Sequence, residues 1–381
     1  MTTLSEHILS ASQALPEGAL LTADQFLHLA PRSAVCTALA RLANAKKLYR
    51  VSRGLYITQI AGKFGLRPPS PESVLDAIMA RTGETMTNTG AWDANALHLT
   101  SQVPMRVIRL TSGLSRKIWV GSMEVELRHG EQWQLCLGDR LAGMAIRAAS
   151  KYSSLQDLTK IHRLLPESDW EEMLSLMAML PNDLAQPIRN FMTYLQRPIV
   201  FVDLDNVLVV DNYFSGYQTI EMFKHANVQA DPAGYLDTWP ELWANLMFRQ
   251  GRSNLQAIHD EFNPIYVAST SWSHYLDQAD FIEVFKRTGL PFVADNLHDA
   301  WTTPKRGMKT RTDEIQAWLD ANHLPGQPVL VLDDLESGAC LEKSQLKQAG
   351  RVVLCEIGIG FIDDKLAEAQ RLLRAQILSP Q

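Results

Sequence analysis

Cysteine is scarce in the 381-residue sequence, and its placement shows no sign of pairing. Cys36, Cys136, Cys340 and Cys355 are scattered and include no Cys-x-x-Cys pair. Such spacing argues against a disulfide framework and against a zinc site, so we expect buried, reduced thiols of a cytoplasmic protein.

Long apolar runs are also missing. No run reaches the ~20 residues that a membrane-spanning helix needs. The first residues, Met1 to His7, have neither the basic start nor the apolar core of a secretory signal. We therefore expect a cytoplasmic protein without a membrane partner.

Several catalytic signatures are absent from the sequence. It has no Walker A loop, no Gly-x-Ser-x-Gly elbow and no His-Glu-x-x-His motif. Gly358-x-Gly360 lacks the third glycine of a dinucleotide fingerprint, so we interpret it as a turn. The formal net charge of -6 argues against a protein coated throughout with nucleic acid. It leaves room for one basic domain.

The composition is that of a folded protein with more than one domain. A hydrophobic fraction of 46% is ordinary for globular chains, and the length indicates two or three domains. Changes in sequence character place the domains at residues 1–60, 61–196 and 197–381.

Residues 1–60 have the pattern of a winged helix-turn-helix. Apolar spacing predicts helices from Leu4 to about Leu15, from Thr22, and from Ala34 to Ala43, followed by a hairpin turning at 52–54. In this fold the third helix enters the DNA major groove and the hairpin contacts phosphates. The predicted DNA contacts are Arg32, Ser33, Thr37, Arg41, Lys46, Lys47, Arg50 and Arg53. The alternative is a protein-contact module, because winged helices also serve that role.

Residues 61–196 are predicted to be α+β at first and then helical. Met105–Thr111 and Lys117–Leu127 alternate like strands, and we expect them to pair antiparallel across the turn 113–116. A helix is expected within 86–97. Four more helices are expected between 141 and 195, with Pro166, Pro181 and Pro187 as breaks.

Two patterns in this half resemble a known family. They are Arg41-Leu-x6-Tyr49-Arg-Val-x-Arg-Gly-Leu-Tyr56 and Thr111-x-Gly113-x-Ser115-Arg116-x-Ile118-x2-Gly121-x3-Val125-x-Leu127. Both are similar to AbiEi-type antitoxins of type IV toxin–antitoxin systems. The resemblance covers roughly residues 5–195. It implies a winged helix that binds the operator of its own operon, and a following segment that helps to counter a nucleotidyltransferase toxin.

The C-terminal half alternates strands with helices, which predicts an α/β domain with a doubly wound, Rossmann-like parallel sheet. The expected strands are 199–202, 264–268, 328–332 and 351–355. Polar residues follow the first three strands. Because the carboxyl ends of parallel strands meet at one edge of a sheet, these residues are expected to form one site.

The residues at those strand ends suit phosphoryl transfer. Asp203 and Asp205 provide a nucleophile and a general acid/base at i and i+2. Hydroxyls after the second strand and a cation can hold phosphate oxygens, and further carboxylates suit Mg²⁺. The alternative is that each cluster is only a turn or a helix cap.

Four motifs in order resemble the haloacid dehalogenase (HAD) superfamily of aspartyl-phosphate phosphatases. They are Asp203-Leu-Asp205-Asn-Val, Ala268-Ser-Thr-Ser-Trp272, the Lys309/Arg311 region and Leu332-Asp333-Asp334. The resemblance is closest to the compact branch in RNA-repair polyproteins, where a Ser-Ser-Trp signature and an Arg-x-x-Glu-Ile-x-x-Trp-Leu helix recur. This sequence has Ser269-Thr-Ser-Trp272 and Arg311-Thr-Asp-Glu314-Ile315-Gln-Ala-Trp318-Leu319.

The resemblance implies a role for each matching residue. Asp203 would be the nucleophile and Asp205 the general acid/base. Phosphate would be held by Ser269, Thr270, Lys309 and Arg311. Mg²⁺ would be held by Asp203, the backbone carbonyl of Asp205 and Asp333, with Asp334 supporting the site. Two positions depart from the pattern: the cation could be Lys305, Lys309 or Arg311, and Asn206 stands where many members have Gly.

Together these patterns predict a DNA-binding, antitoxin-like regulator fused to a Mg²⁺-dependent HAD phosphohydrolase. The expected partners are its own operator DNA, a phosphorylated nucleotide or nucleic-acid end as substrate, and a nucleotidyltransferase toxin. The alternative is a non-enzymatic regulator whose HAD domain senses a phosphorylated ligand or binds the toxin.

Overall fold

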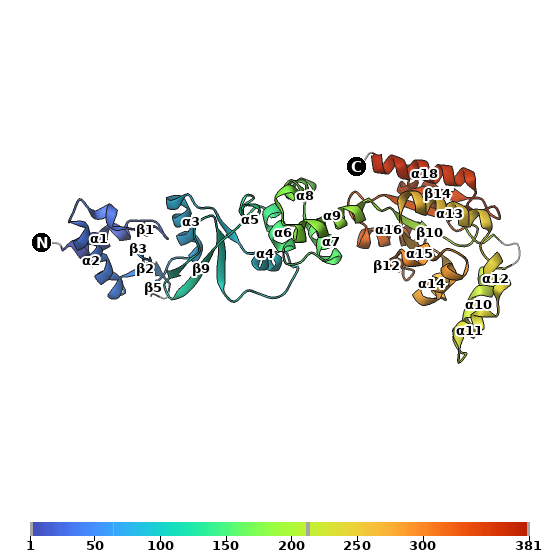
Figure 1. The fold of residues 1–381 in the computed structure, drawn as a ribbon, viewed down its shortest axis with the longest axis horizontal. Coiled ribbons are helices and arrows are strands. Elements are labelled where there is room, and N and C mark those ends of the chain that lie inside the picture. The colour runs from blue at the N-terminus through green and yellow to red at the C-terminus, as the bar shows by residue number, and fades with distance from the viewer. Residues whose placement is uncertain (1–2, 64, 211–213, 379–381) are drawn as a thin grey trace. The chain divides into compact units, whose positions relative to one another are not determined.

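The computed structural model describes residues 3–63, 65–210 and 214–378. The chain divides into two compact units, Met1–Arg189 and Asn190–Gln381. The division falls inside helix α9 (Asn182–Gln196), at whose end the sequence places a domain boundary. Across the described ranges, no helix combines the length and apolarity needed to cross a membrane. Figure 1 shows the elements of each unit.

Residues 3–58 form helical segments around a small antiparallel sheet of order β1-β3-β2. The elements are α1 (Leu4–Gln13), β1 (Leu20–Leu21), η1 (Ala23–Phe26), α2 (Arg32–Asn44), β2 (Leu48–Ser52) and β3 (Leu55–Thr58). Ile8, Val35 and Leu39 are buried in their shared core. The helix predicted from Thr22 is only a 3-10 turn, and Pro31 disfavours helical backbone at the residue before it.

A four-stranded sheet of order β6-β7-β9-β8 follows. Its strands are β6 (Met86–Asn88), β7 (Val107–Thr111), β8 (Arg116–Val120) and β9 (Met123–His129), with α4 (Gly90–Ala96) between β6 and β7. The elements that precede the sheet in the sequence are β4 (Ile60–Gly62), β5 (Gly65–Arg67) and α3 (Pro71–Thr82). The predicted antiparallel pair is wrong, because residues 117–127 fold into a hairpin of their own. Gly121 makes its turn with φ +65°, and β7 pairs in parallel with β9.

Helices complete the first unit. They are α5 (Gln132–Leu135), α6 (Leu141–Ala149), α7 (Leu155–Leu164), α8 (Glu167–Leu174), η2 (Met177–Met179) and α9. Pro187 lies inside α9, so the break predicted there is wrong. A buried ion pair, Arg147 Nε to Asp93 Oδ2 at 2.6 Å, joins α6 to α4. Removing one partner of such a pair costs about 3–5 kcal/mol, so its role here is structural.

The expectation of buried thiols holds for one cysteine and fails for two. Cys355 is buried in β14, whereas Cys36 and Cys136 are exposed and Cys340 is intermediate. Cys36 lies outward because the buried positions of α2 are Val35, Ala38, Leu39 and Leu42.

The second unit is built on a parallel sheet of order β12-β11-β10-β13-β14. The strands are β10 (Ile199–Val202), β11 (Ile265–Ala268), β12 (Leu297–Thr302), β13 (Val329–Asp334) and β14 (Val352–Cys355). Four of them are predicted from their apolar runs. The sequence does not predict β12, since this edge strand carries His298, Asp299 and Thr302 and none of its residues is buried.

Helices cover both faces of this sheet. They are α10 (Gly216–Ala226), α11 (Pro232–Asp237), α12 (Pro240–Asn245), α13 (Arg249–Phe262), η3 (Ser271–His274), α14 (Gln278–Arg287), α15 (Pro291–Asp295), α16 (Arg311–Asn322), η4 (Ala339–Lys343), α17 (Gln345–Gln348) and α18 (Asp363–Leu378). Val200 and Val202 of β10 pack in the core with α10, α13, α14 and α18. Ile199 and Phe201, on the opposite face, pack with α16 and α17.

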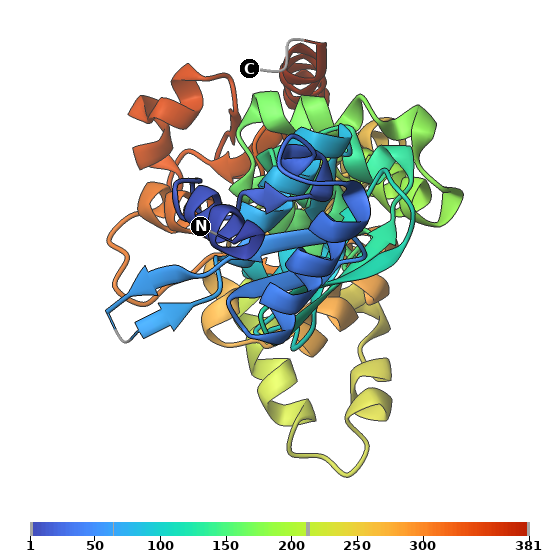
Figure 2. The ribbon, with the colours of Figure 1, turned by 90° about the vertical axis from the view of Figure 1, so that its left-hand side faces the viewer.

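Helices α10, α11 and α12 separate β10 from β11 in the sequence. They project from the body of the second unit in both ribbon views (Figures 1 and 2). Ile220 and Phe223 of α10 and Trp243 of α12 bury their side chains in the core on this side. The segment is therefore a packed helical insertion that lies in the sequence between β10 and α13.

Candidate active site at the carboxyl edge of the parallel sheet

The sheet order creates one position where polar loops can meet. The chain leaves β10 to build β11 and β12 on one side, and then crosses to build β13 and β14 on the other. At such a switch point the loops after neighbouring strands diverge and leave a crevice. The residues that follow β10, β11 and β13 lie at this position.

Asp203, directly after β10, is at the centre of the cluster and is only 2% exposed. Its Oδ1 accepts a hydrogen bond from the Leu204 amide at 2.8 Å, and its Oδ2 accepts one from the Ser337 hydroxyl at 2.9 Å. Arg311 Nη2 lies 3.4 Å from the same Oδ2. The carboxylate is thus held in one orientation by a backbone amide, a hydroxyl and a guanidinium.

Asp333 and Asp334 end β13 and are both buried. The oxygens of Asp203, Asp333 and Asp334 gather so closely that one from each lies within 4.8 Å of the others. The Ser337 hydroxyl oxygen lies within hydrogen-bonding distance of all three, including Asp333 Oδ1 at 2.8 Å, and its single proton can be donated to one of them at a time. Asp334 also accepts the Glu336 and Ser337 amides, so it shapes the turn that presents Ser337.

Arg311 supplies the cation of the cluster. It is the first residue of α16, where Thr310 caps the helix, and its Nε lies 3.1 Å from Asp333 Oδ2. Trp318, two turns along the helix, is buried against Phe201 and donates to the Ala300 carbonyl at 2.7 Å. That packing fixes α16 against the sheet and so aims Arg311 at Asp203.

The other two cations considered for this role lie in different surroundings. Lys305 is half-buried and bonds Glu314 at 2.6 Å, and Glu314 also lies 3.5 Å from Arg311 Nη1. Lys309 is exposed on the loop before α16. Among the described residues no ion pair brings Lys309 to Asp203, so the structure gathers Arg311 and Lys305 at the site.

Ser269 and Thr270 follow β11 and are fully buried. The Ser269 hydroxyl accepts a hydrogen bond from Arg311 Nη1 at 3.5 Å. Its backbone amide donates to the Val202 carbonyl, which keeps the loop beside the end of β10. Thr270 caps η3 and its hydroxyl interacts with Asp203. Both predicted phosphate-binding hydroxyls therefore lie at the nucleophile candidate.

Asp205 lies apart from the other carboxylates. Its Oδ2 accepts a hydrogen bond from the indole nitrogen of Trp272 at 2.9 Å. Among the described residues it is not one of the three carboxylates that gather around Ser337. The Asp205 side chain is therefore not part of the carboxylate cluster, and the resemblance assigns only its backbone carbonyl to the metal.

Asn206 replaces the Gly of many family members and keeps the backbone shape that Gly allows. Its φ is +56°, in the left-handed region that Asn tolerates better than most residues. Its side chain accepts the Gly358 amide at 3.0 Å, which ties the first loop to the loop after β14. The departure therefore leaves the turn intact.

Burial and mutual repulsion shift the carboxyl groups of the cluster. Burial raises the pKa of Asp203, although Arg311 and several hydrogen bonds oppose the shift. Burial, together with the charge of Asp203, raises the pKa of Asp333 to about 8. Burial lowers the pKa of Arg311, but the negative charges of Asp203 and Asp333 outweigh burial and raise this pKa above its ordinary value. The surroundings of Asp203 and Asp333 thus disfavour a negative charge on both carboxyl groups at once, which a proton or a bound cation would relieve.

This cluster fits a hard divalent cation. Its donors are carboxylate oxygens, which Mg²⁺ prefers. Asp333 Oδ2 is buried and receives no hydrogen bond from any residue that the structure describes, even though Arg311 is close. A cation here would complete the coordination of that atom and offset the repulsion between Asp203 and Asp333.

The predicted DNA-contacting residues lie on α2, on the turn that follows it and on the β2–β3 hairpin, and all are exposed: Arg32, Ser33, Thr37, Arg41, Lys46, Lys47, Arg50 and Arg53. Arg32 forms an ion pair with Asp24 at 2.6 Å. Thr37 donates to the Ser33 carbonyl at 2.9 Å. The remaining cations extend from the end of α2 into the hairpin.

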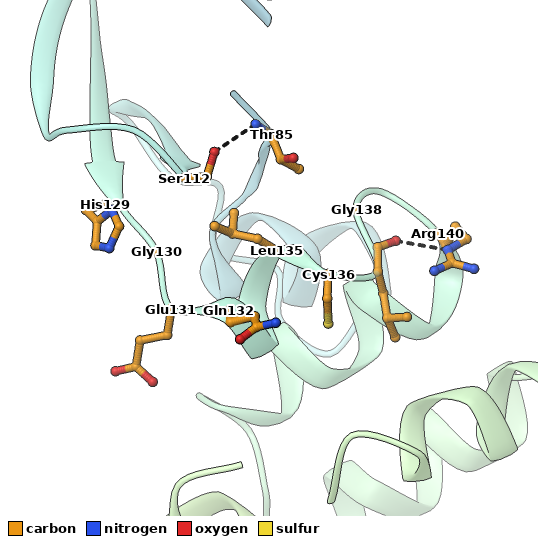
Figure 3. Close-up of a pocket in the computed structure, with 11 residues that line it drawn as sticks. Thr85, Ser112, His129, Gly130, Glu131, Gln132, Leu135, Cys136, Gly138 and Arg140 are labelled. Carbon is orange, nitrogen blue, oxygen red and sulfur yellow. Dashed lines mark hydrogen bonds between the residues drawn. The ribbon is translucent and has the colours of Figure 1, made fainter. Parts of the chain in front are cut away.

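The N-terminal unit also contains a cavity of about 680 Å³, remote in sequence from the carboxylates (Figure 3). Its lining residues are Thr85, Ser112, His129, Gly130, Glu131, Gln132, Leu135, Cys136, Leu137, Gly138 and Arg140. His129 is bonded to the Gly113 carbonyl and Arg140 to the Leu137 carbonyl. Glu131 accepts the Trp133 indole. These side chains stabilise the local fold, so nothing in the lining assigns a reaction.

Sequence reasoning missed two contributors to the active site. Ser337 lies three residues beyond Asp334, in a loop without strong periodicity, and only the turn around Asp334 brings it back. Trp272 is part of a recognised signature, but its bond to Asp205 depends on tertiary packing. The position of Glu314 three residues after Arg311 in a helix was a usable signal, because such residues share a helix face.

Comparisons with known proteins agree with the fold of the second unit. Neither the curated proteins nor the solved structures contain a significant match to the chain. Residues 7–172 match a family of unknown function, DUF6088, which neither names an antitoxin nor supports the AbiEi resemblance. Residues 199–366 match the model described as the HAD domain in Swiss Army Knife RNA repair proteins. The C-terminal part of the chain is accordingly similar to the HAD domains of RNA repair proteins, and this similarity suggests a phosphohydrolase.

Proposed function

We propose that the C-terminal unit is a Mg²⁺-dependent phosphomonoester hydrolase that forms an aspartyl phosphate on Asp203. One observation carries the proposal: Asp203 contacts a guanidinium, two hydroxyls and a second buried carboxylate at a single strand end. Separate turns or caps would not need to converge on one carboxylate.

The chemistry follows from what each side chain can do. An oxygen of Asp203 attacks phosphorus, and the bond from phosphorus to the ester oxygen breaks. Asp205 donates its proton to the leaving alcohol oxygen and then removes a proton from the water that hydrolyses the acyl phosphate. Trp272 keeps Asp205 oriented through its indole hydrogen bond.

The residues around Asp203 would stabilise the negative charge of the phosphoryl group. Arg311, Ser269 and Thr270 would hold the non-bridging oxygens of the phosphoryl group as charge redistributes. Asp203, Asp333 and Asp334 would hold Mg²⁺, which supplies positive charge at the phosphoryl oxygens. Lys305 is too firmly engaged with Glu314 to be the main phosphate ligand, and we assign it to positioning Arg311 through that carboxylate.

A nucleotide or the phosphorylated end of a nucleic acid is the proposed substrate, because the matching family is named for RNA repair. This step rests on family analogy. Hydrolysis of a generic ester is therefore tested first, separately from substrate choice.

The test is turnover by the purified full chain with Mg²⁺ and a generic phosphate ester. Asp203→Asn should lower kcat by about 10³-fold or more, because it removes the nucleophile. Asp320→Asn, at an exposed position of α16, is the matched control and should behave as the wild type. A chelator should abolish turnover. Turnover that persists in Asp203→Asn, or none with any phosphate ester, would contradict the proposal.

The alternative is a regulator that binds a phosphorylated ligand without hydrolysing it, or that binds a nucleotidyltransferase toxin through its HAD domain. It would show ligand or toxin binding by calorimetry in both the wild type and Asp203→Asn, with no phosphate release from either. Measuring phosphate release and binding on the same samples separates the two functions.

We also propose that the first 60 residues form a winged helix that binds the protein's own operator DNA. The exposed cations on α2 and the hairpin support this proposal. Arg41, Lys47 and Arg53 lie within the helix end and hairpin that such a fold presents to DNA. Arg32 contributes less, since its charge is already paired with Asp24.

Salt titration tests the DNA proposal. Affinity for the upstream sequence should fall steeply with salt, and Arg41→Ala or Arg53→Ala should reduce the slope by about 1 each. Arg163→Ala, at an exposed position of α7 in the same unit, should leave the slope unchanged. Absent or salt-independent binding would favour a protein-contact role instead.

A further inference from the structure

A cavity of about 550 Å³ opens beside Asp205 in the C-terminal unit. This volume lies within the range of small-molecule sites. The lining includes Gly216, Tyr217 and Lys224 from α10 and Tyr275 from the end of η3. The cavity therefore begins at the group that protonates the leaving oxygen and extends toward the helical insertion, while Asp203 lies outside its lining.

Two tyrosines in this cavity are unusually exposed. Tyr217 is 73% exposed and Tyr275 is 60% exposed, although large aromatic rings are mostly well buried. The ammonium of Lys224 lies 5.4 Å from the centre of the Tyr275 ring and is bonded to Glu221 at 2.7 Å. The cavity thus offers accessible ring faces with one cation close by, and Lys224 and Glu221 balance each other's charge.

We infer that this cavity holds the nucleoside part of the substrate, with its base stacked on Tyr217 or Tyr275. The inference rests on the proposed function, because it takes the phosphate to lie at Asp203. A group esterified to that phosphate leaves through the oxygen that Asp205 protonates, and the space next to Asp205 is this cavity. Tyr217 and Tyr275 then determine which esters are accepted.

The chemistry of the lining favours a nucleoside over other alcohols. A base stacks on aromatic side chains irrespective of its identity, whereas an alkyl alcohol or glycerol has no flat face to offer. A sugar alone would require several hydrogen-bonding groups converging on it, and here Lys224 and Glu221 already satisfy each other. A phosphotyrosine side chain would also stack, but its single ring would leave much of the volume unfilled.

The experiment compares kcat/KM of the full chain for adenosine 5′- and 3′-monophosphate with that for β-glycerol phosphate. Wild-type enzyme should prefer at least one nucleotide, and Tyr217→Ala and Tyr275→Ala should each lower that preference by roughly 5- to 100-fold. Tyr217→Phe and Tyr275→Phe should restore it, because the ring is retained. Trp239→Ala, an exposed aromatic outside the cavity, should not change it.

Two further substrates identify the source of the nucleoside. A short single-stranded oligonucleotide with a terminal phosphate, hydrolysed better than the mononucleotide, assigns the site to a nucleic-acid end, and the reverse assigns it to a free nucleotide. Either result supports the inference. A preference for a phosphotyrosine peptide, or equal kcat/KM for nucleotide and glycerol phosphate with no response to the tyrosine variants, overturns it.

Failure of the proposed function can be recognised separately. Should no ester be hydrolysed, calorimetry of adenosine monophosphate binding to Asp203→Asn decides the inference alone. Binding that Tyr217→Ala and Tyr275→Ala weaken supports the nucleoside site without catalysis. Binding unaffected by either change, or no binding, overturns it.

Discussion

The Ser337 hydroxyl lies within hydrogen-bonding distance of three carboxylates, so we expect the geometry of the site to depend on it. Ser337→Ala removes the hydroxyl that lies within hydrogen-bonding distance of both Asp203 and Asp333, so their oxygens lose a fixed orientation. Because such supporting bonds typically contribute 10–100-fold to metal affinity or activity, we expect a loss of about that size in apparent Mg²⁺ affinity. Activity measured against Mg²⁺ concentration checks it. Ser253→Ala on the exposed side of α13 is the control, and equal Mg²⁺ curves for both variants would contradict the prediction.

Trp272 provides a second prediction at this scale. Trp272→Phe keeps an aromatic ring but removes the donor that lies 2.9 Å from Asp205 Oδ2. A hydrogen bond to a carboxylate favours its ionised form, so its loss should move the pH–rate limb of the general acid to higher pH. We expect kcat to fall about tenfold while KM changes little. A uniform loss of activity with an unshifted pH profile would indicate only damaged packing.

The sequence predicts the residues of the site to the extent that each follows a recognisable strand. Asp203, Ser269 and Asp333 stand directly after apolar runs, and parallel topology then brings them together. The choice among three cations could not be made, because it depends on where α16 begins and how Trp318 packs. Ser337 was not predicted, since a loop hydroxyl has no periodic pattern to mark it.

At the scale of elements, the start of α10 is tightly fitted against η3. A Cβ built on Gly216 would come 2.5 Å from the indole nitrogen of Trp272, which is buried and cannot move aside freely. Gly216→Ala should therefore destabilise the protein by about 1–3 kcal/mol despite the better helix propensity of Ala. Urea unfolding measures the change. An unchanged or higher midpoint would show that α10 can shift away without cost.

Helix α7 carries a titratable group that should make stability depend on pH. Burial lowers the pKa of His162, and Arg163 adds to the shift. A group whose folded pKa is depressed binds fewer protons when folded, so its contribution is present above the unfolded value of about 6.5 and is lost as pH falls below it. Urea unfolding at pH 7.5 and 5.5 should show the loss. His162→Phe should reduce the difference between the two pH values, and an identical difference in both proteins would contradict the assignment.

The elements that sequence patterns missed share a physical cause. β12 is a half-buried edge strand of mixed polarity, so its residues show neither an apolar run nor a strict alternation. The sequence pattern predicts one strand where the structure has the β8–β9 hairpin. The pattern continues on both sides of Gly121, and this single glycine, which makes the turn, does not mark the break clearly. Pairing direction depends on which strands lie beside each other, and β7 pairs with β9 in parallel through contacts that no local pattern encodes.

At the scale of the whole molecule, the division into two compact units predicts separable activities. A chain beginning at Asn182 keeps α9 whole, and each unit has its own core. We expect this shortened protein to hydrolyse small phosphate esters with the kcat/KM of the full chain. It should not bind operator DNA, because α2 and the hairpin are removed. Insoluble or inactive protein would show that the N-terminal unit is needed to stabilise the catalytic one.

The position of β10 has a consequence for how the protein is made. Its four apolar residues are the centre of the sheet, with β11 on one edge and β13 on the other. During synthesis β10 leaves the ribosome before the other strands of its sheet, and β13 follows ~130 residues later, an interval on the order of ten seconds at typical elongation rates. For that time the edge of β10 that later pairs with β13 remains exposed to other chains. The C-terminal unit should therefore be the part of this protein that depends on chaperones in the cell.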